Sequence, residues 1–307
     1  MIVDLPGTTS GQVAAHLVRM RDEGGAVALG RVLTLVVVTG PHEAEAAIDA
    51  ANAASREHPC RIIVLDRGTS SPAEGLDAQI RVGADAGASE VVVLRPSASV
   101  TAEVDTLVIP LLLPDAPVVA WWTSTVPDEP SRDPIGAMAS RRITDALACA
   151  DPLATLARLR ASYSPGDTDL SWARCTIWRA QVAAALDQPP YEPVTSVTVS
   201  GNARHPVAAL LAGWLSRGLD CPAHVVDAAS SASMTGVRLE RPGGVIQLER
   251  PDGSKVATLI QPGHPRQRVV LPPRSVSDAL AEELRRIDPD QTYGHVLLEG
   301  MERVEVP

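Results

Sequence analysis

LLLPDAPVVAWW, Leu111 to Trp122, is the stretch of this chain that decides the fold. The part from Pro117 to Trp122 predicts a short buried strand that ends on two adjacent tryptophans. A loop rich in proline and acids follows, TSTVPDEPSRDP, and after it RRITDA. In an open α/β sheet, ligands and partners meet the fold at the carboxyl ends of strands and in the loops after them. This end of the sheet is therefore expected either to perform chemistry or to hold another protein.

Apolar segments upstream predict the neighbouring strands. Those rich in β-branched residues, as expected for strands covered on both faces, are Arg31 to Thr39, Arg61 to Asp66 and Glu90 to Leu94. An Ala-rich helix between the first two gives a parallel pair with a right-handed crossover, and alternation from Leu76 to Val82 predicts a half-exposed strand at an edge. The first predicted element is a helix from Thr8 or Thr9. Residues 1–150 thus predict a doubly wound, Rossmann-like α/β domain with a mostly parallel, mixed sheet.

The rest of the chain predicts a helical connector and a second domain. Residues 151–190 contain a short helix and then a long one, DTDLSWARCTIWRAQVAAALD, which the Pro189-Pro190 pair follows. Between Thr235 and Ile260, three alternating segments are joined by Pro-Gly and Asp-Gly turns, a pattern typical of hairpins. Residues 191–307 therefore predict a smaller α+β domain with an antiparallel meander.

The net charge and the cysteines limit the kinds of partner and of metal or disulfide chemistry expected for this protein. The formal net charge of the 307-residue chain is −10, which argues against nucleic acid or an anionic membrane as the main partner. The cysteines are scattered and form no C-x-x-C, which favours reduced thiols and no metal; they are Cys60, Cys149, Cys175 and Cys221. The N-terminus has no basic n-region of a signal peptide, and the apolar runs are too short to span a bilayer. We expect a cytoplasmic protein.

Motifs for catalysis and cofactor binding are missing from the sequence. It contains no G-x-x-x-x-G-K-[ST], G-x-G-x-x-G, G-x-S-x-G or H-E-x-x-H, so we expect no catalytic residue, no cofactor and no metal. One weak anion-binding candidate is VSGNARHP, where a strand delivers Gly201 and Asn202 to a helix start and Arg204 or His205 could face an anion. The alternative is an ordinary turn with Pro206 at the first helical position.

The Trp121–Trp122 pair has two interpretations. Neighbours in a strand point to opposite faces, so one indole could face a cleft or a partner while the other packs in the core; alternatively both are buried, as tryptophan usually is. Trp and Arg are the residue types that anchor protein interfaces. We therefore hypothesise one partner-facing surface made of the strand end, the loop to Asp133, RRITDA and the following Trp-bearing helix. Its members are Trp121, Trp122, Arg141, Arg142, Asp145, Trp172, Trp178 and Arg179.

Two alternatives to this surface stay open. The apolar stripe of the Trp172–Trp178 helix equally favours packing against a core. The basic pair Arg141-Arg142 equally suits a helix end, where positive charge complements the helix dipole without any ligand.

A set of segments that spans nearly the whole chain carries a resemblance to a known family. They are MIVDLPGTT, GRVLTLVVV, HPCRIIVLDRG, LDAQIRVGADAGASEVVVLR, LLLPDAPVVAWW, DPIGAMASRRITDA and GDTDLSWARCTIWRAQVAAALDQPP. In this order they resemble the OpcA family, the glucose-6-phosphate dehydrogenase assembly proteins of bacteria. The resemblance is strongest over residues 1–190 and looser in the meander, and none of the segments is a catalytic motif.

The resemblance implies a non-catalytic partner protein. Such a protein binds glucose-6-phosphate dehydrogenase, promotes its oligomeric assembly or active state as an allosteric activator, and raises flux into the oxidative pentose phosphate pathway. Substrate and NADP would be bound by the dehydrogenase. No cysteine here matches a redox motif, so no redox response is carried over. The alternative is an α/β enzyme or sensor that itself binds a sugar phosphate or nucleotide, which predicts a pocket where arginines and amide donors converge.

Overall fold

A computed structural model of the chain describes residues 1–24, 32–67, 75–82, 90–97 and 104–306. The chain forms two compact units that interleave along the sequence. Unit 1 consists of Met1–Ala148, Ser162–Thr168 and Val276–Pro289, and unit 2 consists of Cys149–Ala161, Asp169–Ser275 and Asp290–Pro307. A compact unit need not be an independently folding domain, so the predicted division near residues 150 and 190 stays a prediction.

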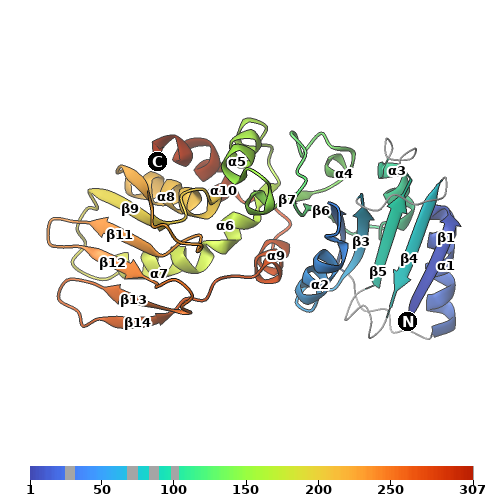
Figure 1. The fold of residues 1–307 in the computed structure, drawn as a ribbon, viewed down its shortest axis with the longest axis horizontal. Helices are drawn as coiled ribbons and strands as arrows, with labels where there is room; N and C mark the ends of the chain where they lie inside the picture. Colours follow the sequence, from blue (N-terminus) through green and yellow to red (C-terminus); the bar gives the residue numbers. More distant parts are fainter. Residues whose placement is uncertain (25–31, 68–74, 83–89, 98–103, 307) are drawn as a thin grey trace. The chain divides into compact units, whose positions relative to one another are not determined.

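Unit 1 is built on a mixed sheet of eight strands in the order β1-β4-β5-β3-β2-β6-β7-β8 (Figure 1). The strands are β1 (Ile2–Thr8), β2 (Leu33–Thr39), β3 (Cys60–Asp66), β4 (Leu76–Arg81), β5 (Glu90–Pro96), β6 (Val118–Trp122), β7 (Arg141–Thr144) and β8 (Asp167–Asp169). From β5 through β3, β2 and β6 to β7 every pair is parallel, whereas β4 pairs antiparallel with both β5 and β1. The predicted mixed, mostly parallel sheet is confirmed.

The central strands form because their residues are β-branched or aliphatic and can be covered on both faces. Every residue of β2 and β3 is buried. The flanking helices of unit 1 are α1 (Ser10–Gly24), α2 (Ala44–Ser55), α3 (Val104–Val108), α4 (Pro134–Ala137) and α9 (Val276–Leu284), with short 3-10 turns η3 (Ile109–Leu111) and η4 (Ala146–Ala148). The helix α9 returns from far along the chain and packs against α2.

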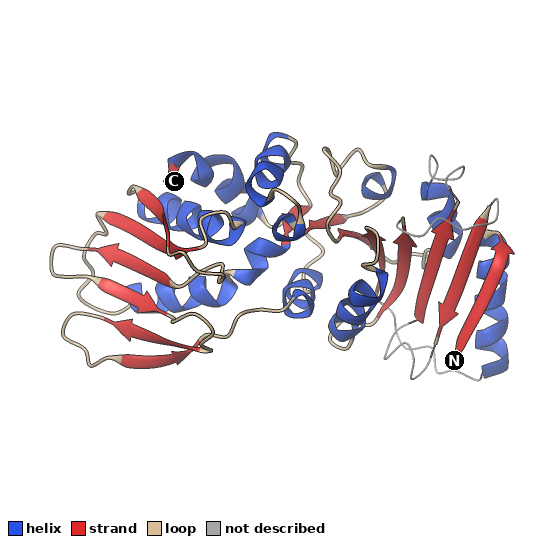
Figure 2. Cartoon of the chain, in the orientation of Figure 1, coloured by secondary structure: helices blue, strands red, loops and turns tan. Residues whose placement is uncertain are grey.

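Unit 2 contains a second sheet of seven strands in the order β14-β13-β12-β11-β9-β10-β15. The strands are β9 (Ser196–Gly201), β10 (Ala223–Asp227), β11 (Gly236–Glu240), β12 (Ile246–Glu249), β13 (Val256–Ile260), β14 (Gln267–Val270) and β15 (Val304–Glu305). The run from β11 to β14 is antiparallel throughout, which confirms the predicted meander (Figure 2). The pairs of β10 with β9 and with β15 are parallel.

The helices of unit 2 centre on α8, whose residues are almost all apolar. They are α5 (Pro152–Ala161), α6 (Leu170–Arg174), α7 (Thr176–Leu186), α8 (Pro206–Leu219) and α10 (Gln291–His295), followed by η5 (Val296–Gly300) and η6 (Met301–Arg303). A helix that is apolar on all sides belongs in an interior, and α8 packs against β9, β10, α6 and η5. The α/β fold class is thus confirmed, with two large sheets.

Four local predictions differ from the structure. Residues Ile2–Thr8 form the edge strand β1, although no element was predicted before the helix from Thr8 or Thr9. β1 pairs with β4, so the strand predicted at an edge, Leu76 to Val82, is the second strand of the sheet. RRIT is strand β7 and not a helix end. The long helix expected from Asp167 starts later, at Leu170, because Asp169 caps α6 by accepting from the amide of Ser171. It is also divided in two, since Cys175 separates α6 from α7. Arg31, the first residue of one predicted strand, lies outside the described residues.

Candidate functional site

The tryptophan pair of β6 lies in the core of unit 1. Trp121 is 2% exposed and Trp122 is fully buried. Their strand lies between β2 and β7, and because adjacent side chains point to opposite faces, the two indoles fill both covered sides of the sheet. Neither indole N–H has a hydrogen-bond partner within the described residues. The interpretation that both tryptophans are core residues is therefore correct, and the one in which an indole faces outward is wrong for this structure.

The loop after β6 packs directly onto Trp122. At Gly136, in α4, an added Cβ would lie 1.7 Å from the carbonyl oxygen of Pro130 and 3.1 Å from the Trp122 ring. The side chain of Asp133 caps α4 by accepting from the amide of Ile135 at 2.9 Å. The acid-rich loop is thus folded back over the strand end, and the indole beneath it is closed off from solvent.

Arg141, the first residue of β7, is neutralised inside unit 1. Its guanidinium forms a buried ion pair with Glu283 of α9 and donates to the carbonyl oxygen of Asp288 at 2.7 Å. The Arg141 and Glu283 side chains are 3% and 4% exposed. The pair attaches the returning helix α9 to the sheet of unit 1.

The charge of Arg142, the next residue of β7, is also balanced by a carboxylate of unit 1. Its side chain points to the opposite face of the strand. It pairs with the buried carboxylate of Asp167 and donates to the carbonyl oxygens of Ala139 at 3.0 Å and Pro165 at 2.6 Å. Burial raises the pKa of Asp167, and the hydrogen bond from Arg142 opposes that rise. Gly166 has a positive φ of +98°, and an added Cβ there would lie 2.9 Å from the guanidinium of Arg142.

The end of β7 is equally buried. Thr144 donates its hydroxyl to the carbonyl oxygen of Thr168 in β8 at 3.1 Å, and Asp145 is 3% exposed. Every predicted partner-binding residue of unit 1 therefore lies in its interior. They are Trp121, Trp122, Arg141, Arg142 and Asp145.

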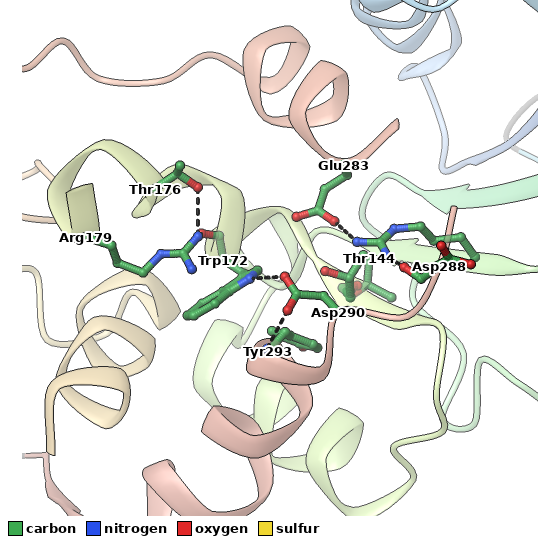
Figure 3. Close-up of polar contacts among 10 residues, drawn as sticks. Thr144, Trp172, Thr176, Arg179, Glu283, Asp288, Asp290 and Tyr293 are labelled. Atoms are coloured by element: carbon green, nitrogen blue, oxygen red, sulfur yellow. Dashed lines mark hydrogen bonds and ion pairs between the residues drawn. The ribbon is translucent and has the colours of Figure 1, made fainter. Parts of the chain in front are cut away.

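The remaining members of the predicted surface lie in unit 2, around Trp172 of α6. The indole N–H donates to the carboxylate of Asp290 at 2.8 Å, and Asp290 caps α10 by accepting from the amide of Tyr293. The rings of Trp172 and Tyr293 lie 5.9 Å apart. The guanidinium of Arg179 stacks on Trp172, with Cζ 3.5 Å from the ring centroid, and donates to Thr176 at 2.8 Å (Figure 3).

These contacts favour the core interpretation of the α6–α7 segment. Trp172 and Trp178 are buried and Arg179 is half-buried. An Arg over an indole face gains a cation–π attraction within its own chain. Seven of the eight predicted residues are therefore buried, Arg179 is half-buried, and the eight are divided between two units. Direct contact of their side chains with a partner stays a prediction.

The predicted anion-binding turn is occupied by its own hydrogen bonds. The amide of Asn202 donates to the carbonyl oxygen of Ala232 at 3.0 Å, and that of His205 to the carbonyl oxygen of Asn202 at 3.0 Å. The amide of Arg204 donates to the Asn202 side chain at 3.0 Å. Gly201 permits the close approach of a neighbouring loop, since an added Cβ would lie 2.3 Å from the carbonyl oxygen of Ser233. The segment is an ordinary turn before α8, with these amide donors already used.

The described residues contain neither a metal-binding cluster nor a disulfide. No group of three or more His, Cys, Asp and Glu side chains there could hold a metal ion. None of the four cysteines forms a disulfide, and burial, with the charge of Asp220, raises the pKa of the Cys221 thiol. No described helix combines the length and the apolar character needed to cross a membrane.

Two family models match the chain, one after the other. The first is described as the N-terminal domain of a glucose-6-phosphate dehydrogenase subunit and matches residues 51–161. The second is described as the C-terminal domain of a glucose-6-phosphate dehydrogenase subunit and matches residues 165–297. No curated protein matches the chain. The two matches follow each other with only a short gap and together cover most of the sequence.

Proposed function

This chain belongs to the OpcA glucose-6-phosphate dehydrogenase assembly family, and on that premise we propose that it is a non-catalytic subunit which binds glucose-6-phosphate dehydrogenase and promotes its active oligomer. The observation that carries the proposal is the pair of consecutive matches, both described as domains of a subunit of that enzyme. In this proposal the protein acts in the cytoplasm as an allosteric activator of glucose-6-phosphate dehydrogenase, an enzyme of the oxidative pentose phosphate pathway. Glucose 6-phosphate and NADP are bound and converted by the dehydrogenase.

The use of polar side chains inside unit 1 supports a structural rather than a catalytic role there. Three buried arginines of this unit are paired with carboxylates: Arg141 with Glu283, Arg142 with Asp167, and Arg61 with Glu90. An arginine whose charge is already matched by a carboxylate of the same chain has little net charge to offer a developing negative charge, which is the role that preorganised cationic donors take in catalysis. The sequence also lacks the usual nucleotide-binding motifs.

The test is an assay of dehydrogenase activity and particle mass with and without this chain. We expect a complex that contains both proteins, a larger dehydrogenase oligomer and a higher rate of NADPH formation. The control is the dehydrogenase with an unrelated acidic protein at the same concentration, which separates a specific effect from the stabilisation that any added protein gives. Unchanged mass and unchanged activity would contradict the proposal.

The same assay addresses the alternative that this chain is itself an enzyme acting on a sugar phosphate or nucleotide. The chain alone, given glucose 6-phosphate and NADP, is expected to produce no NADPH. Turnover by the chain alone would replace the assembly role with a catalytic one.

A further inference from the structure

A cavity of about 300 Å³ opens within unit 2. Its walls come from the end of α6, from Trp178 of α7, from the first turn of α8, from the loop before β11, from the turn after β12 and from the segment after β14. This volume is at the lower end of the range for small-molecule sites, roughly 300–1,000 Å³. The cavity therefore has room for a small metabolite.

The charged residues of the lining are mostly positive. Three arginines contribute to it, Arg174, Arg250 and Arg274, against one carboxylate, Asp252. Asp252 is already engaged in its own loop, because it accepts from the hydroxyl of Ser230 at 2.7 Å and from the amide of Gly253 at 2.9 Å. The hydrogen bond from Ser230 lowers the pKa of Asp252. The cavity is thus lined by three guanidinium groups. The single acid of the lining is held in its own loop, and its charge also acts on Arg250.

Arg250 is the buried member of the three, at 6% exposure. It donates to the carbonyl oxygens of Leu271 at 2.9 Å and Met234 at 3.0 Å, and its Cζ lies 5.2 Å from the ring centroid of Trp178. Burial lowers the pKa of Arg250, and the charge of Asp252 opposes that fall. Its hydrogen bonds go to neutral carbonyl groups, which hold the guanidinium in position. An anion in the cavity would supply the charge that burial makes costly to leave unmatched.

The other two arginines stand at the partly exposed part of the lining. Arg274 reaches the carbonyl oxygen of Ala173, at the end of α6, at 3.5 Å. Arg174 acts on a neighbour outside the lining: burial, and then the charge of Arg174, lower the pKa of His205. The ring of His205 is bonded to the hydroxyl of Ser233, a lining residue, at 2.9 Å. The positive charge of Arg174 therefore acts on a residue that is hydrogen-bonded to the wall of the cavity.

The start of α8 adds to this positive charge. The helix has 14 residues, no acid in its first turn and no side-chain cap, and Val207 of that turn lines the cavity. The first amides of a helix have no partner within the helix, and the aligned peptide dipoles favour negative charge at this end. The helix start and the three guanidinium groups thus favour the same kind of ligand.

We propose that this cavity binds a small phosphate monoester, with the phosphate among Arg174, Arg250 and Arg274 and the organic part against Trp178. A dianionic phosphate suits several guanidinium groups at once, because each can donate two parallel hydrogen bonds to its oxygens. The indole of Trp178 offers an apolar wall, which an inorganic ion would leave unused. The site does not depend on the proposed function, so its failure would leave the assembly role standing.

The test is isothermal titration calorimetry and thermal unfolding of the full chain with defined probes. The probes are glucose 6-phosphate, ribose 5-phosphate and glycerol 3-phosphate, with inorganic phosphate and glucose as comparisons. We expect at least one ester to bind at a single site and raise the unfolding temperature, inorganic phosphate to bind more weakly, and glucose to have no effect. No binding of any ester at millimolar concentration overturns the proposal, and so does binding of inorganic phosphate alone.

Variants assign the binding to this cavity. Arg174→Gln and Arg274→Gln should each weaken the ester about tenfold or more, the loss expected for a hydrogen bond to a charged group. Arg268→Gln is the matched control: it makes the same change of charge in β14 of the same unit, is exposed and lies outside the lining, and should bind as the unchanged chain does. Circular dichroism checks that each variant is folded, and one folded cavity variant is enough to decide the test. Unchanged affinity in a folded cavity variant overturns the proposal.

Discussion

The buried pair between Arg141 and Glu283 should decide whether α9 stays attached to unit 1. We predict that Glu283→Gln opens α9 locally, since it removes the charge of one partner and leaves the guanidinium of Arg141 buried beside a neutral amide. Both side chains are almost fully enclosed, and breaking such a pair from one side costs about 3–5 kcal/mol. The hydrogen bond from Arg141 to the carbonyl oxygen of Asp288 offsets part of this, so about 3 kcal/mol is expected.

Amide hydrogen exchange of residues 276–284 measures this opening directly. An energy of about 3 kcal/mol corresponds to a roughly 150-fold change in an equilibrium constant, so protection of α9 should fall by about that factor while the central strands β2 and β3 keep theirs. Local exchange suits a chain of two compact units better than a single unfolding midpoint, because such a chain need not unfold in one step.

The matched control is the exposed pair in the same unit. Arg285 lies 3.5 Å from Glu57, and the two side chains are 58% and 59% exposed. An exposed pair of this kind contributes about 0–1 kcal/mol, so Glu57→Gln should leave the protection of α9 nearly unchanged. Equal effects of Glu57→Gln and Glu283→Gln would refute the reasoning. A further check is the double variant Arg141→Met with Glu283→Leu, which should recover much of the lost protection because it buries no unpaired charge.

Three further predictions concern stability. Trp122→Ala should cost about 3–5 kcal/mol, the range for removing a buried large aromatic side chain; urea unfolding measures it, and a loss below about 1 kcal/mol would contradict a core role. Gly136→Ala should destabilise unit 1, since the new Cβ meets a backbone oxygen at 1.7 Å, whereas Gly11→Ala, with nothing within 4 Å on helix α1, should stabilise it by about 0.5–1 kcal/mol. The pKa of His205 is lowered from 6.5 in the folded state. As the pH drops below about 6.5, the unfolded chain therefore takes up this proton before the folded chain does, and the free energy of unfolding falls. His205→Gln should make the free energy of unfolding less dependent on pH in this range, and an unchanged dependence would refute the prediction.

The central strands could be predicted because a local pattern determines them. β2, β3, β5 and β6 are mostly apolar and almost entirely buried, and a run of that composition has few other stable environments. β1 was missed because it is an edge strand of alternating exposure, with Pro6 and Gly7 within it; its pairing with β4 depends on a segment distant in sequence. β7 was missed as a strand because two charged residues begin it, and the carboxylate that neutralises the first comes from α9.

The candidate site was also hard to predict, because the partners of its residues lie in distant segments of the chain. Arg and Trp anchor interfaces, but they also fill interiors when their polar groups find partners within the chain. Trp172 has such a partner in Asp290, and Arg142 has one in Asp167. These partners lie in other segments, so composition alone cannot separate an interface residue from a core residue. The residues that line the cavity of unit 2 were missed because they come from separate elements and share no motif.

The buried arginines of this protein can be sorted by what neutralises them. Where a carboxylate completes the pair, as Glu283 does for Arg141, the charge is balanced within the chain and the arginine serves the fold. Arg250 differs, because its hydrogen bonds go to two carbonyl oxygens and it lines a cavity with two further arginines. Carbonyl dipoles orient a guanidinium but leave its net charge in place. Arg241 is also buried and donates to a carbonyl oxygen, that of Pro190, so such hydrogen bonds alone do not identify a binding arginine. Arg250 is set apart by its place in the lining of a cavity beside Arg174 and Arg274, and there the proposed site puts the negative charge of a ligand.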